Sequence, residues 1–251
     1  MAEDEGTNGM GTIVAPQINA QYHQHFFTMR IDPMIDGQQN SVQQVDTYSL
    51  PYPTGHPKNP FGNGFTSDYT ILKDTKEGQQ TANYDTSRFW KIVNQDRQHP
   101  YAKTPVGWKI SSGHTAPFYA QPDSLVAERA GFAKKTLWVT PYHEDQMFAG
   151  GFYCNQSGGD DTVEVWANKG VQNIEQKDIV LWYTFGITHL PRVEDFPIMP
   201  VEYCGFTMKP CNFFIANPGM DVPPTNKKIN HSVNAKEEMN KQQDGCCSNK
   251  L

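Results

Sequence analysis

The chain has 251 residues, a formal net charge of -6 and a hydrophobic content of 37%. This length is enough for one large β domain or two small ones with a sizeable core. The acidic balance, with no basic run, argues against nucleic acid and anionic membrane surfaces as partners. No apolar stretch approaches the roughly 20 residues that cross a bilayer.

The N-terminal residues and the cysteines favour a cytoplasmic protein. Residues Met1–Gly6 are acidic and polar, unlike a secretion signal. The cysteines are odd in number and lack the regular spacing of a disulfide framework. We therefore interpret all of them as reduced thiols: Cys154, Cys204, Cys211, Cys246 and Cys247.

β-Branched and aromatic residues, separated by clusters of Gly and Pro, predict a mostly β structure. One helix is expected at Ser124–Ala133, with Asp123 or Ser124 as its N-cap. Many short strands with turn-rich connections favour an all-β fold, a large antiparallel β-sandwich. The strands are expected at Gln21–Ile31, Arg88–Val93, Val106–Ser111, Thr136–Pro141, Thr162–Ala167, Asp178–Phe185 and Tyr203–Met208.

The C-terminal segment differs in composition from the rest of the chain. Residues 225–251 are rich in Asn, Lys, Gln, Asp and Glu and contain no aromatic residue. Such a segment has little apolar surface to bury. We therefore expect one folded domain at residues 1–224 and a disordered polar tail at residues 225–251.

Two histidines, His23 and His25, lie two residues apart within the first predicted strand. A strand directs residues i and i+2 to the same face, so both imidazoles would point the same way. A third histidine from a distant strand, His189, would complete a three-nitrogen site with room for solvent or substrate. Such a set suits copper or zinc in a redox or hydrolytic role.

Six stretches of the sequence resemble the copper-containing amine oxidases, in the same order and with the same spacing. They cover the chain from about Gly11 to Pro224. The stretches are Tyr22–His25, Arg30–Gly37, Phe89–Asn94, Leu137–Tyr142, Asp178–Tyr183 and Gly186–Glu202.

The resemblance implies a β-sandwich catalytic domain, a homodimer, one copper ion per chain and topaquinone, a quinone cofactor made from a tyrosine of the chain itself. Enzymes of this family convert a primary amine, O2 and water to an aldehyde, ammonia and hydrogen peroxide. Mapped by motif, the copper ligands are His23, His25 and His189.

The resemblance also implies a second, peripheral cation site for calcium or manganese. By motif position it would use the carboxylates of Asp32 and Asp178 and the carbonyls of Pro33 and Ile179. Oxygen ligands of this kind suit such ions. Met34 stands where some relatives have a further aspartate.

The family's cofactor tyrosine lies in an Asn-Tyr-Asp/Glu motif upstream of the histidine pair, and its catalytic aspartate lies further upstream still. Neither is found among the 22 residues before His23. An Asn-Tyr-Asp sequence occurs at Tyr84, but after the pair and before a predicted strand, so we interpret it as a coincidence. The sequence is thus expected to be a catalytic domain truncated on its N-terminal side.

Three functional hypotheses follow. The chain is an amine oxidase segment that is active only with the upstream part, or a non-catalytic copper-binding β-sandwich protein that is a fragment or pseudo-enzyme. In the third hypothesis it is a structural β domain and the matched histidines are accidental. A peroxisomal location is the alternative to the cytoplasm, because the C-terminal Asn249–Leu251 is a loose variant of a peroxisomal signal.

Overall fold

A computed structural model describes residues 9–113, 115–153, 155 and 157–222. The chain divides into two compact units, Met1–Phe213 and Phe214–Leu251. The predicted tail, and the domain end near Pro224, lie outside the described residues. The described part of the second unit contains one short 3-10 helix, η3 (Pro218–Asp221).

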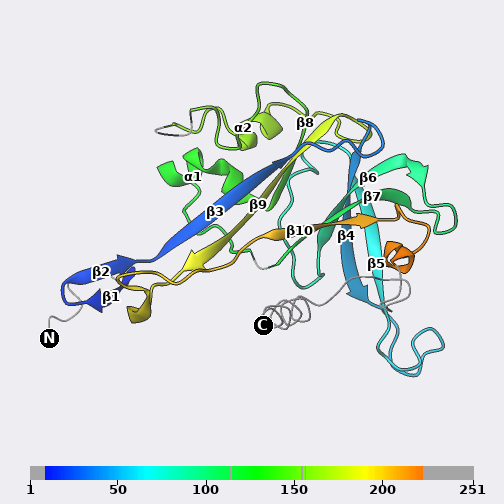
Figure 1. Cartoon of the computed structure of the whole chain (residues 1–251), viewed down its shortest axis with the longest axis horizontal. Helices are drawn as coiled ribbons and strands as arrows, with labels where there is room; N and C mark the ends of the chain where they lie inside the picture. The colour runs from blue at the N-terminus through cyan, green and yellow to red at the C-terminus, as the bar shows by residue number, and fades with distance from the viewer. Residues whose placement is uncertain (1–8, 114, 154, 156, 223–251) are drawn as a thin grey trace, which may run out of the picture. The chain divides into compact units, whose positions relative to one another are not determined.

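The first unit is built from antiparallel sheets (Figure 1). A hairpin is formed by β1 (Gly11–Ala15) and β2 (Ile18–Gln21). A three-stranded sheet has the order β3-β9-β8, with β3 at His23–Ile31, β9 at Ile179–His189 and β8 at Leu137–Pro141. A five-stranded sheet has the order β10-β7-β6-β4-β5, formed by β10 (Phe206–Cys211), β7 (Pro105–Ser112), β6 (Phe89–Gln98), β4 (Ser41–Ser49) and β5 (Phe65–Leu72).

The main core lies between the three-stranded and five-stranded sheets, which confirms the predicted sandwich. Alternate residues of β9 point to opposite faces, as the strand period requires. Ile179, Leu181 and Tyr183 join one apolar cluster with residues of the five-stranded sheet such as Val42 and Ile92. Both faces of β9 are buried, so this strand is a nearly continuous apolar run.

The other face of β9 packs on a helix where a strand was predicted. Residues Thr162–Ala167 were expected to be extended, and this prediction is wrong, because α2 spans Val163–Asn168. Val163 and Ala167, four residues apart, are both fully buried in a second cluster with Trp182. The i,i+4 spacing of a helix therefore explains the burial better than alternation does.

The predicted helix at Ser124–Ala133 is shorter than expected. The N-cap is Ser124, whose hydroxyl accepts the backbone N–H of Ala127, and α1 spans only Leu125–Arg129. A 3-10 helix, η1 (Gly131–Lys134), follows it.

The last predicted strand begins three residues later than expected, at Phe206. A further 3-10 helix, η2 (Val193–Asp195), follows β9. Among the described residues, no helix is long and apolar enough to span a bilayer.

Candidate metal centre

The pairing of β3 with β9 brings the three predicted histidines together. His23 of β3 lies directly opposite His189 of β9 in the antiparallel register. His25 lies two residues after His23 on β3 and therefore on the same face as His23. One ligand atom from each residue lies within 4.8 Å of the others. The imidazole rings of His25 and His189 each meet the ring of His23 edge-on at a centroid distance of 4.8 Å.

The tautomer of His23 follows from its local hydrogen bond. Nδ1 of His23 lies 2.8 Å from the backbone carbonyl oxygen of Gln21. A carbonyl oxygen can only accept, so Nδ1 must carry the proton and donate it. In a neutral ring the other nitrogen, Nε2, then presents its lone pair.

The tautomer of His189 is fixed in the same way by a carboxylate. Nε2 of the buried His189 lies 3.2 Å from Oδ2 of Asp195. Arg192 holds that carboxylate in turn, since its Nη2 lies 2.8 Å from Oδ1 and its backbone N–H donates to Oδ2 at 2.9 Å. These hydrogen bonds, led by that of the Arg192 side chain, hold the pKa of Asp195 well below its usual range. The ionised carboxylate therefore accepts the Nε2 proton and leaves Nδ1 of His189 with a lone pair.

The two lone pairs face each other. Nδ1 of His189 lies 3.2 Å from Nε2 of His23. Two acceptor nitrogens at this distance repel unless a cation lies between them. Two nitrogens bound side by side to one ion, each at about 2.0 Å, lie about 3 Å apart. The three imidazoles therefore fit a transition-metal ion, and neutral imidazole is a donor that suits Cu(II) and Zn(II).

The histidine cluster is open on one side. A cavity of about 580 Å³ adjoins His23 and His189 and is lined in part by Ile18 of the β1–β2 hairpin and by Met199. His23 and His25 are exposed, whereas His189 is only 6% exposed. One ligand is thus anchored in the protein while the other two face accessible space, which leaves room for a further ligand.

Asp195 was not identified from the sequence. Its role depends on η2, the 3-10 turn that brings it back to His189 six residues along the chain. The reciprocal hydrogen bonds between Arg192 and Asp195 define this turn. An Arg-x-x-Asp sequence just beyond the third histidine is the only sequence signal for it.

The residues expected at a second cation site lie at one end of the three-stranded sheet. Asp32 and Pro33 directly follow β3, and Asp178 directly precedes its antiparallel partner β9, which begins at Ile179. The carboxylate of Asp32 is paired with Nη1 of Arg30 at 3.1 Å. The backbone carbonyl of Asp178 accepts the N–H of Tyr142.

Tyr84 contacts a segment on the opposite face of the sheet from the histidines. Its hydroxyl donates to the carbonyl oxygen of Thr115 at 3.0 Å and lies 2.7 Å from the backbone nitrogen of the same residue. The segment that follows Thr115 is bound by Gln24, whose amide donates to the carbonyl of Pro117. Gln24 alternates with His23 and His25 along β3, so it points to the other face.

Three imidazoles at the end of two paired strands fit a protein that holds one metal ion on nitrogen ligands. Residues 1–229 match the model of the copper amine oxidase enzyme domain. The chain therefore belongs to the copper amine oxidase family, an enzyme family whose members use copper and topaquinone and act on primary amines and O2.

Several relatives share the matched region. Copper amine oxidase 1 of Schizosaccharomyces pombe is 45% identical over 228 residues, which is 90% of this chain and 32% of the relative. The peroxisomal primary amine oxidase of Pichia angusta is 40% identical, over 90% of this chain and 33% of its own length. A solved copper-containing benzylamine oxidase from Hansenula polymorpha superposes with a TM-score of 0.79 at 37% identity, covering 86% of this chain and 34% of that one. The chain thus spans about a third of the length of these relatives.

Proposed function

We propose that this chain forms the copper-binding part of the catalytic domain of a copper-dependent primary amine oxidase. His23, His25 and His189 would hold one copper ion per chain. The observation that supports this most directly is the 3.2 Å distance between Nε2 of His23 and Nδ1 of His189. The other ring nitrogen of each histidine lies beside an oxygen acceptor, so both facing nitrogens present lone pairs. The family match favours copper over zinc as the metal of this proposed site.

The residues of this chain position the ligands. The Gln21 carbonyl orients His23. Asp195 orients His189 and makes the imidazole a stronger electron-pair donor to the metal. When bound, copper and topaquinone together supply the redox chemistry that converts a primary amine, O2 and water to an aldehyde, ammonia and hydrogen peroxide. The open cavity beside His23 and His189 gives small molecules access to the ligand cluster.

The organic half of the site would come from residues outside these 251. The chain corresponds to about a third of the length of its relatives. Tyr84, the tyrosine of its Asn-Tyr-Asp sequence, uses its hydroxyl to hold the Thr115 backbone. The topaquinone tyrosine and the catalytic base are therefore proposed to lie in the remaining two thirds. A homodimer, a calcium or manganese ion near Asp32 and Asp178, and a peroxisomal location like that of the P. angusta relative belong to the same proposal.

The experiment is aerobic loading of the purified chain with Cu(II), followed by metal analysis and titration with phenylhydrazine. One copper per chain with no coloured hydrazone supports a copper half-site that lacks the quinone. A stoichiometric hydrazone would instead place a quinone within this chain, at Tyr84 or another tyrosine. Retention of copper by a chain with all three histidines changed to Ala would reject the site. His143→Ala is the matched control, because that side chain is 58% exposed and lies outside the cluster.

A further inference from the structure

A second cavity lies on the face of the three-stranded sheet opposite the histidines. Phe26 and Thr184, on β3 and β9, point to this face and line a cavity of about 450 Å³. This volume lies in the range of small-molecule sites, roughly 300–1,000 Å³. The other walls come from α1, η1 and the loop that contains Phe118.

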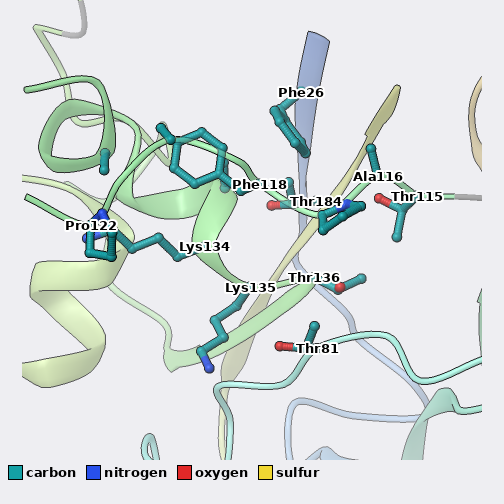
Figure 2. A pocket seen from close by; sticks show the side chains of 14 residues that line it. Phe26, Thr81, Thr115, Ala116, Phe118, Pro122, Lys134, Lys135, Thr136 and Thr184 are labelled. Carbon is teal, nitrogen blue, oxygen red and sulfur yellow. The ribbon is translucent and has the colours of Figure 1, made fainter. Parts of the chain in front are cut away.

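The cavity has an apolar side and a polar side (Figure 2). Phe26 and Phe118 lie at one side, with their rings edge-to-face at a centroid distance of 5.6 Å. Thr81 and Lys135 lie at the other side, and Thr136 lies between them and the aromatic rings. The hydroxyl oxygen of Thr136 accepts the backbone N–H of Ala82, which leaves its own O–H group to donate to a ligand.

The charge at the polar side is positive. Two adjacent lysines line the cavity, and Nζ of Lys134 is neutralised by Glu164, whose carboxylate oxygens lie 2.9 and 3.0 Å away. Lys135 is half-buried, and among the described residues it forms no ion pair. A half-buried ammonium beside an apolar cavity favours a ligand that brings a negative charge.

We propose that this cavity binds a small monocarboxylic acid with an apolar body. The body would lie against Phe26 and Phe118, and the carboxylate would meet the ammonium group of Lys135 and the hydroxyls of Thr81 and Thr136. Aromatic walls bury the apolar part, and the charged end fixes its orientation. The site is separate from the histidine cluster, because β3 directs Phe26 and His25 to opposite faces.

The test is calorimetric titration of the full chain with 4-phenylbutyrate and with 4-phenylbutanol, which has the same body without the charge. One equivalent of phenylbutyrate should bind, about three- to fivefold more tightly than the alcohol, as a partly exposed ion pair provides. Lys135→Met should abolish this preference and leave the affinity for the alcohol unchanged. Lys169→Met, at an exposed lysine outside the cavity, should preserve the preference.

Two further measurements make the outcome decisive. Phe118→Ala should weaken both ligands to the same extent, with folding checked by thermal melting. Loading with Cu(II) should leave phenylbutyrate binding unchanged, so a failure of the metal site is distinguishable from a failure of this one. Absence of saturable binding to the folded chain, or an unchanged preference in Lys135→Met, would overturn the proposal.

Discussion

Asp195 accepts a hydrogen bond from Nε2 of His189 at 3.2 Å, and this contact aims Nδ1 of the same ring at His23. We predict that Asp195→Asn weakens Cu(II) binding by roughly 10- to 100-fold, since an amide can hold the ring in the wrong tautomer. Competition with a chelator of known affinity would measure the change. Asp145→Asn, at an exposed aspartate, is the control. Equal affinities for Asp195→Asn and the control would show that the carboxylate does not support the site.

Gly186 sets how closely β3 approaches β9. A Cβ atom at this position would lie 2.1 Å from the backbone carbonyl oxygen of His25. Gly186→Ala should therefore separate the two strands, destabilise the fold by about 1–3 kcal/mol and weaken copper binding. Gly205→Ala should change neither quantity, because no described residue other than its chain neighbours lies within 4 Å of its added methyl group. Thermal melting and copper titration of the two variants provide the comparison, and identical behaviour would contradict the strand register.

The ion pair between Asp46 of β4 and Arg88, which directly precedes β6, is mostly shielded from solvent. Nε of Arg88 lies 2.9 Å from Oδ1 of Asp46, whose side chain is 9% exposed, and Thr86 donates to the same oxygen. Asp46→Ala would leave the Arg88 charge without its partner and should cost about 3 kcal/mol. Asp36→Asn, which breaks an exposed pair with Arg97, should cost under about 1 kcal/mol. Chemical denaturation measures the free energy of unfolding of both variants. Equal costs would contradict the conclusion that the Asp46–Arg88 pair is the more strongly stabilising one.

The same pair predicts a pH dependence of stability. Burial alone would raise the pKa of Asp46, but the hydrogen bonds and charge of Arg88, with those of Thr86 and Gln44, lower it below its ordinary value. A lowered pKa in the folded state stabilises the fold above the unfolded pKa of about 3.9, and this contribution is lost as the pH falls through the folded value. The stability difference between the wild type and Asp46→Ala should be constant from about pH 5 to pH 7, because the carboxyl is ionised there in both the folded and the unfolded state. The difference should shrink below about pH 4. A difference that grows on acidification would contradict this sign.

The face of the sheet that carries the histidines also exposes apolar side chains. Phe27 is 51% exposed and Met29 is 46% exposed, and with Phe185 they line a cavity of about 580 Å³. Contiguous apolar surface of this kind favours association. Replacing Phe27 and Met29 together by Lys should lower self-association in sedimentation experiments, whereas Leu125→Gln, at an 81% exposed residue outside that cavity, should not. A wild type that sediments as a monomer at all concentrations would contradict this prediction.

The positions of the histidines were predictable because the strand period of two is a strong local signal. His23 and His25 share a face for that reason, and the register with β9 supplies His189. Asp195 could not be predicted, because its contact depends on a short turn rather than on any period. The sandwich itself follows from the many β-branched and aromatic runs.

Two elements show where local patterns mislead. The sequence Val163–Ala167 alternates apolar and polar residues at its start, as a strand does, yet burial at the i,i+4 spacing makes it helical. The strand β4 was missed because Gln43, Gln44 and Asp46 make it read as a polar loop. Its buried carboxylate is tolerated only because Arg88 and Thr86 lie next to it, which is a tertiary contact.

The most direct test of the copper site is electron paramagnetic resonance of the Cu(II)-loaded chain, with the histidine variants measured in parallel. We expect one type 2 copper signal with hyperfine coupling to three imidazole nitrogens, reduced to two in His25→Ala and in His189→Ala and unchanged in His143→Ala. A signal that keeps the same nitrogen coupling when His23, His25 and His189 are all replaced by Ala would contradict it.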